Sequence, residues 1–128
     1  MTDKKPYLIK AIYDWLADND LTAQILIENP SGGWVSGVPK NFLEEAQLVL
    51  NISPTATRNL SIEKDYLYFD TRFSGQSCSV IVDMLAISGI FPREDHMEGM
   101  FFEIDPKVLE GKKETKSPEN LGGFKFVK

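Results

Sequence analysis

The spacing of apolar residues changes from a helical to an alternating period at about residue 20, and this change limits the possible folds most. Before it, apolar residues between Leu8 and Leu16 recur at three- and four-residue intervals. Pro6 suits the first helical turn, where its missing N–H leaves no hydrogen bond unmade. The polar run at residues 18–20 ends the pattern. The sequence therefore predicts a single N-terminal α-helix over about residues 6–16.

Short runs with a period of two follow, and turn residues separate them. Residues 83–91 are apolar without alternation, so we expect a short helical turn or irregular core cover there. The fold class predicted is mainly β with one N-terminal helix, built as a small antiparallel barrel or a pair of curled sheets. The predicted strands are Ala23–Glu28, Val35–Val38, Gln47–Ser53, Leu60–Ile62, Tyr66–Phe73, Ser79–Val82 and a closing strand over 100–104.

The apolar arc of the helix is wider than one contact with a domain requires. Beside the apolar residues that recur between Leu8 and Leu16, Ile9 and Tyr13 add a second apolar row, and Tyr7 extends the apolar surface at the start of the helix. Either the helix is packed deeply against its own sheet, or one face meets the core and another meets a second subunit. We favour the second arrangement, because a symmetric helix pair is a simple route to a two-fold dimer.

Composition and charge limit the function classes. Of 128 residues, 42% are hydrophobic, which is enough for one core in the part that precedes residue 105. The net charge of -5 opposes nucleic-acid binding, which depends on basic residues that neutralise phosphates. Cys78 is the single cysteine, and the chain shows no signal peptide or membrane span. We expect a soluble, cytoplasmic protein with no membrane partner.

A polar stretch over residues 105–120 precedes an apolar and basic C-terminal peptide, Gly122 to Lys128. The stretch contains too few aliphatic residues to offset its ordering entropy, so it predicts a flexible linker. In the peptide, Phe124 and Phe126 alternate with lysines, which suits an extended segment that docks on a partner. A last strand folded back on the domain, or plain disorder, remains open at this point.

Candidate chemistry is sparse. His96, the only histidine, lies in an acidic loop that is more typical of a solvated surface than of a metal site. Cys78 has no histidine near it in sequence, and Ser31-Gly32-Gly33 lacks the lysine and helix of a phosphate loop. We therefore expect no enzyme activity, no cofactor and no metal. Binding of an extended ligand by aromatic and methionine side chains fits better.

Several segments resemble the stringent starvation protein B (SspB) family of bacterial adaptors, which deliver tagged proteins to the ClpXP protease. They are KPYLIKAIYDWLADNDL from Lys5, QLVLNISP from Gln47, Asn59-Leu60, FDTRFSG from Phe69 and the terminal FKFVK. The resemblance covers about residues 5–104 and then the tail. It implies a helix that pairs across a two-fold axis and a small SH3-like or Sm-like β-barrel. It also implies a groove for the ssrA tag of stalled-ribosome products, and a tail that docks on the ClpX unfoldase.

The resemblance also implies where the functional residues lie. It divides the chain into a domain over 1–105, a flexible linker over 106–121 and a docking peptide over 122–128. Thr71 and Ser74 depart from the smaller residues of relatives, and the tail has Phe in place of aliphatic residues. The expected homodimer interface is Tyr7, Ile9, Tyr13 and Leu16. The ssrA-peptide groove falls on Val49, Asn51, Ser53, Thr71, Phe73 and Met100, and the ClpX-docking residues are Phe124, Lys125, Phe126, Val127 and Lys128.

The implied mechanism has no chemical step. The adaptor holds the tag at one site and the unfoldase at another, which makes their encounter effectively intramolecular. A linker over 106–121 would span about 20–24 Å as a flexible coil. The alternative from the same fold class is an Sm-like RNA-binding module, which the acidic composition disfavours.

Overall fold

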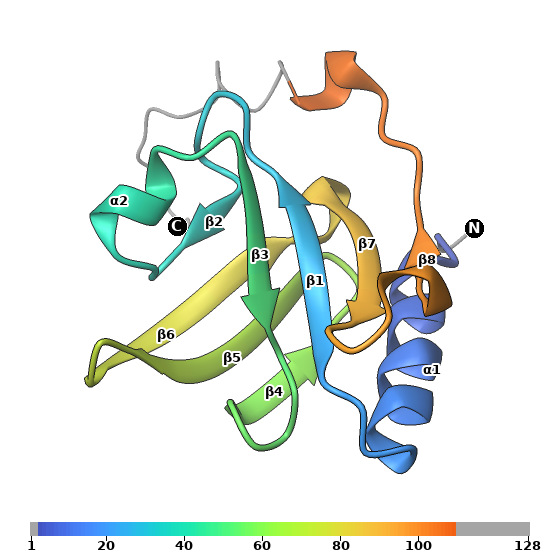
Figure 1. The fold of residues 1–128 in the computed structure, drawn as a ribbon. Coiled ribbons are helices and arrows are strands. Elements are labelled where there is room, and N and C mark those ends of the chain that lie inside the picture. Colours follow the sequence, from blue (N-terminus) through green and yellow to red (C-terminus); the bar gives the residue numbers. More distant parts are fainter. Residues whose placement is uncertain (1–2, 110–128) are drawn as a thin grey trace.

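The computed structural model describes residues 3–109, which form one N-terminal helix and two four-stranded antiparallel sheets (Figure 1). Helix α1 (Lys5–Asp18) has Pro6 in its first turn, where the missing N–H costs nothing. Asn19 ends the helix, and its side-chain Nδ2 donates a hydrogen bond of 2.8 Å to the Trp15 carbonyl. Within the described residues, no helix is long and apolar enough to span a membrane.

The first sheet has the order β3-β1-β7-β8, and all neighbouring strands are antiparallel. Strand β1 alternates strictly between buried and half-buried residues, because one of its faces is turned to the core. Strands β3 and β8 are the two edges of this sheet. The strands are β1 (Ala23–Glu28), β3 (Gln47–Asn51), β7 (Ile87–Pro92) and β8 (Met100–Phe101).

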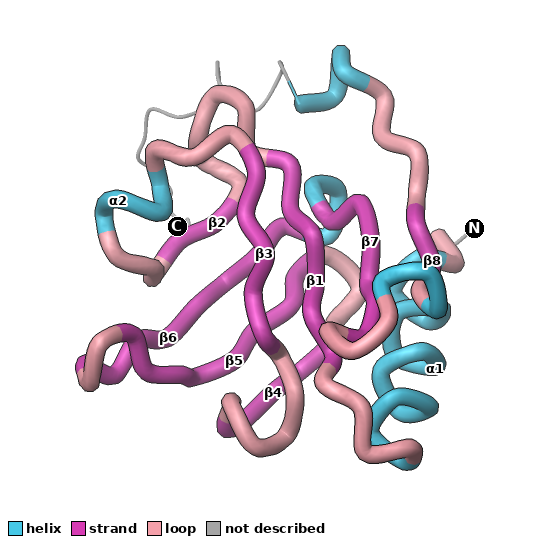
Figure 2. The backbone as a smooth tube through the Cα atoms, in the orientation of Figure 1, coloured by secondary structure: helices cyan, strands magenta, loops and turns pink. Residues whose placement is uncertain are grey.

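The second sheet has the order β2-β6-β5-β4, and its long central hairpin β5–β6 extends away from α1 (Figures 1 and 2). Ser74 and Gly75 turn this hairpin, both with positive φ (52° and 83°), as a tight two-residue turn requires. The strands are β2 (Val35–Ser36), β4 (Arg58–Ile62), β5 (Tyr66–Phe73) and β6 (Gln76–Asp83).

The core is one cluster that receives the inward-facing residues of both sheets and one face of α1. Burial of these aliphatic side chains is the main stabilising term of the fold. The members with no exposed surface are Ile9, Leu16, Ala23, Ile25, Ile27, Ile52, Leu67, Val82, Ala86, Ile87 and Ile90. The predicted class, mainly β with one N-terminal helix, is confirmed; in the described residues the two sheets remain separate and form no closed barrel.

Three segments differ from the sequence prediction. Helix α2 (Lys40–Leu43) was not expected, although Pro39 immediately before it is a common helix-start signal. Residues 83–91 begin with a 3-10 turn, η1 (Met84–Ala86), which agrees with the short helical turn expected there. Strand β7 follows and was not expected; it lacks alternation because five of its six residues are buried. Strand β8 is shorter than the predicted 100–104, and a second 3-10 turn, η2 (His96–Glu98), precedes it.

The C-terminal boundary also differs in detail. Residues 106–109, the first part of the predicted linker, are helical, and Leu109 is only 7% exposed and belongs to the core cluster. The Leu109 side chain thus packs this turn against the domain, and the Asp105 side chain accepts a hydrogen bond from the Lys107 backbone N–H at its start. The rest of the predicted linker and the whole docking peptide, residues 122–128, lie outside the described residues.

Candidate peptide-binding surface

Strand β3 presents an open edge next to an exposed aliphatic side chain. Its only pairing partner in the described part of the chain is β1, so its other side keeps backbone N–H and C=O groups available to an added strand. Leu48 and Leu50 point into the core, whereas Val49 is 49% exposed. This edge has the geometry that β-strand addition requires.

The turn that follows β3 is closed by its own side chains. The Asn51 carboxamide oxygen accepts a hydrogen bond of 2.9 Å from the Ser53 backbone N–H, and Thr57 Oγ1 donates one of 2.9 Å to the Ser53 carbonyl. The Ser53 side chain is only 4% exposed, and its hydroxyl lies 3.3 Å from the Thr55 hydroxyl. The Ser53 side chain therefore shapes the turn, and the predicted role of Ser53 in the groove falls to its backbone.

Thr71 connects this turn to the second sheet. From β5, its Oγ1 donates a hydrogen bond of 2.8 Å to the Ala56 carbonyl. Two segments that are distant in sequence, the turn after β3 and the end of β5, thereby lie together. The Thr71 hydroxyl is engaged internally, so a bound peptide would meet mainly its methyl group.

Phe73 lies near the end of β5 and packs on a residue that sequence reasoning missed. Its ring centroid is 5.2 Å from that of Phe42 in α2, with the rings tilted by 60°. Both side chains are partly buried against the core. Only tertiary contact reveals Phe42, because α2 is one turn long and carries no periodic pattern.

Met100 lies apart from this surface. It is on β8, at the opposite edge of the first sheet from β3, and it pairs with Ile90. Three strand spacings, about 14 Å, separate those edges. The structure thus brings Asn51, Thr71 and the turn between them together, but it does not bring Met100 to them.

Helix α1 has an exposed stripe that differs from the predicted dimer face. Ile9 and Leu16 have no exposed surface and belong to the core of their own subunit, so the expectation that they contact a second subunit is corrected. Tyr7 and Trp15 are 67% and 44% exposed, and Ala11 lies between them at helical spacing. The width of the apolar arc alone does not identify the face of the helix that the core covers.

Tyr13, the fourth predicted interface residue, is half-buried at the side of this stripe. Burial raises the pKa of its hydroxyl, and the negative charge of Asp14 adds to that shift. An ion pair between Lys10 and Asp14, with Nζ and Oδ2 3.3 Å apart, lies on the solvent side of the helix. Such an exposed pair contributes little to stability.

His96 and Cys78, the two residues considered for chemistry, each contact neighbouring groups of the domain. The His96 ring packs edge-on against Phe91, with centroids 5.0 Å apart. Cys78 is partly buried against the core, and its sulfur lies 3.7 Å from the Gln76 carbonyl oxygen. Among residues 3–109, no three His, Cys, Asp or Glu side chains are grouped so that they could hold a metal ion.

An open strand edge, an exposed helical stripe and a small β-rich core define the class of the protein: a small, mainly β domain with two surfaces that are open to another chain. Comparison with known proteins gives its family. The family model described as "SspB: Stringent starvation protein B" matches residues 3–122. The "Stringent starvation protein B homolog" of Haemophilus influenzae (strain ATCC 51907 / DSM 11121 / KW20 / Rd) is 33% identical over 142 aligned residues, which cover 92% of this chain and 93% of that protein.

The chain therefore belongs to the stringent starvation protein B family. This membership supports a stringent starvation protein B-like role of the adaptor type.

Proposed function

We propose that this chain is a non-enzymatic proteolysis adaptor that binds ssrA-tagged polypeptides in the cytoplasm and tethers them to the ClpX unfoldase of ClpXP. The observation that carries the proposal is the open edge of β3, with exposed Val49 on it and the Asn51 turn at its end. The family membership of the chain supports the same assignment.

The tag would bind as an extended segment along β3. Backbone groups of the strand edge would supply the affinity, and exposed side chains would supply the specificity. Val49 would contact one tag side chain, and the Phe42–Phe73 pair offers a second apolar contact. The Thr71 hydroxyl is hydrogen-bonded to the Ala56 carbonyl. Thr71 would therefore reduce the space for the tag peptide and would not add a polar contact to it.

The C-terminal peptide would supply the second contact. Residues 124–128 combine three apolar and two basic side chains and would dock on ClpX, and the polar chain before them would act as the tether. A short flexible tether sets an effective concentration in the millimolar range, so two weak contacts together hold the tagged protein at the unfoldase.

A homodimer would form through the exposed stripe of α1. Tyr7, Ala11 and Trp15 share one helical face, and two such stripes related by a two-fold axis make a self-complementary contact. A dimer would carry two tag sites and two tails, which increases the avidity for ClpX.

Binding of a fluorescent ssrA-tag peptide, measured by anisotropy, tests the tag site. Val49→Asp should weaken binding at least tenfold, because it places a charge on the apolar contact of β3. Ile81→Asp is the matched control, since Ile81 is also an exposed β-branched strand residue, but on β6 of the second sheet. Equal losses for both variants, or none for Val49→Asp, would rule out the β3 edge. Single-stranded RNA that bound more tightly than the tag would favour the RNA-binding alternative.

Deletion of residues 124–128 tests the tether. Tag binding should remain unchanged, whereas stimulation of ClpXP degradation of a tagged substrate should disappear. Normal stimulation by the truncated chain would show that the peptide is not the ClpX contact.

A further inference from the structure

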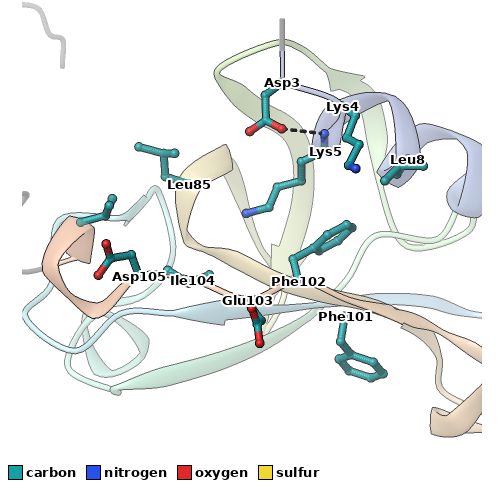
Figure 3. A pocket seen from close by; sticks show the side chains of 11 residues that line it. Asp3, Lys4, Lys5, Leu8, Leu85, Phe101, Phe102, Glu103, Ile104 and Asp105 are labelled. Atoms are coloured by element: carbon teal, nitrogen blue, oxygen red, sulfur yellow. Dashed lines mark hydrogen bonds between the residues drawn. The ribbon is translucent and has the colours of Figure 1, made fainter.

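A pocket of 410 Å³ lies between the start of α1 and the chain that leaves β8 (Figure 3). Strand β8 is at the opposite edge of the first sheet from β3. The volume is in the range of sites that bind small ligands. Six apolar and five charged residues line the pocket. The apolar lining comes from Leu8, Leu85, Phe101, Phe102, Ile104 and Val108, and the charged lining from Asp3, Lys4, Lys5, Glu103 and Asp105.

The half-buried lysine of the pocket is already engaged. Lys5 Nζ donates a hydrogen bond of 3.0 Å to the Met84 carbonyl and lies 5.4 Å from the centre of the Phe102 ring. Burial lowers the pKa of this amine, although the carboxylates of Asp3 and Asp83 partly oppose that shift. The ammonium group of Lys5 is thus engaged within the domain.

The charged lining has a small excess of negative charge, with three carboxylates and two lysines. Asp3 accepts a hydrogen bond of 3.2 Å from the Lys5 backbone N–H, and Asp105 accepts one of 2.9 Å from the Lys107 backbone N–H. One of the two lysines, Lys5, is engaged by the Met84 carbonyl. A partly apolar pocket with this excess of carboxylates favours a ligand that is both apolar and basic.

We propose that this pocket binds the C-terminal peptide of the same chain, residues 122–128. The peptide offers Phe124 and Phe126 for the apolar lining residues, and Lys125 and Lys128 for the carboxylates of the lining. Charge complementarity extends beyond the pocket. Residues 1–109 contain nine basic and sixteen acidic side chains, a net charge of −7, whereas residues 110–128 contain five lysines and three glutamates, a net charge of +2.

The chain is long enough for this contact. The described structure ends at Leu109, immediately after Val108, which lines the pocket. The 15 residues from there to Phe124 would span about 19–23 Å as a flexible coil, and up to about 50 Å when extended. At the millimolar effective concentration of such a tether, even a contact of millimolar affinity is substantially occupied.

The contact would make the tail self-masking. A peptide held in the pocket is not available to another protein, so the pocket would lower the apparent affinity of the tail for its receptor. This consequence rests on the proposed docking to ClpX, whereas the contact itself does not.

Methyl NMR of the full chain and of a chain that ends at Leu121 tests the contact. Deletion of the peptide should shift the methyl signals of Leu8, Leu85, Ile104 and Val108, and leave that of Ile81, on the second sheet, in place. A synthetic GGFKFVK peptide added to the truncated chain should shift the same pocket signals. Unchanged pocket signals, or shifts centred on another surface, would overturn the proposal.

A pocket variant separates this inference from the proposed function. Leu85 is 50% exposed, so Leu85→Arg should fold and should repel the lysines of the tail; Ile81→Arg is the matched control. In full-length Leu85→Arg, the signals of Leu8 and Val108 should move to their truncated-chain positions, and binding to ClpX should tighten several-fold. If the pocket signals shift as expected but neither the wild-type chain nor Leu85→Arg binds ClpX, the proposed tether to ClpX is refuted and the pocket contact stands. Wild-type signals in Leu85→Arg would refute the pocket contact.

Discussion

Adjacent residues on α1 face opposite environments, and replacing each by alanine tests which face of the helix is buried. Leu16 has no exposed surface, so Leu16→Ala leaves a cavity in the core cluster. Such a truncation costs about 2–5 kcal/mol of unfolding free energy, the lost transfer energy plus the cavity term. For a domain of this size, each kcal/mol lowers the Tm by about 4–8 °C, so the Tm should fall by at least about 8 °C.

Trp15→Ala should behave differently. Nearly half of the Trp15 side chain is exposed, so its removal takes less packing from the subunit, and we expect a loss of less than about 2 kcal/mol. If the stripe of Tyr7, Ala11 and Trp15 joins two subunits, this variant should weaken self-association at least tenfold, because buried tryptophans dominate interface energetics.

Urea unfolding at one fixed protein concentration measures the loss of unfolding free energy in both variants. Sedimentation velocity over a dilution series measures the loss of self-association. Fixed concentration matters because dimerisation itself adds to the apparent stability. The m-value should remain unchanged for both variants. The assignment of faces is refuted if Leu16→Ala costs under 1 kcal/mol, or if Trp15→Ala unfolds the subunit more than Leu16→Ala does.

Two further predictions concern single contacts. The Glu94 carboxylate accepts hydrogen bonds from the backbone N–H and the hydroxyl of Thr22 (2.9 and 2.7 Å), and these bonds hold the pKa of Glu94 below its usual value. The stabilisation from this carboxylate is therefore present above the usual glutamate pKa and is lost as the pH falls through the lowered pKa. Glu94→Gln should thus lower the Tm at about pH 7, and the difference from the wild-type Tm should shrink steadily as the pH is lowered below the usual glutamate pKa. Gly37 and Gly32 both have positive φ, but a Cβ on Gly37 would collide with the Ser79 carbonyl, whereas a Cβ on Gly32 has open space. Gly37→Ala should thus cost at least about 2 kcal/mol more than Gly32→Ala in urea unfolding, and similar losses would contradict the packing of Gly37 on β6.

Elements with a clean period were predictable from sequence. The bounds of β1 and β5 agree with prediction residue for residue, since each strand has one face in the core and the other near solvent. Strand β7 was not recognised, because burial on both faces removes the alternation that marks a strand. Helix α2 is too short to show a period at all.

The candidate site was predictable only in part. The motifs around Asn51 and Thr71 indicated a shared surface, and the hydrogen bond from Thr71 to the Ala56 carbonyl places those segments together. Burial of Ser53, the contact of Phe42 with Phe73, and the position of Met100 on β8 depend on how the strands pair. Strand order is a long-range property that no local pattern encodes.

The sequence by itself determined the local structure: one helix, the alternating strands and their turns, because these follow from the residue-by-residue period of apolar side chains. It also determined the adaptor family, through motifs that occur together and in order. Only the tertiary structure decided which of two apolar helix faces is covered. Ile9 and Leu16 enter the core while Tyr7 and Trp15 stay outside, since that choice is made by the sheets against which α1 packs.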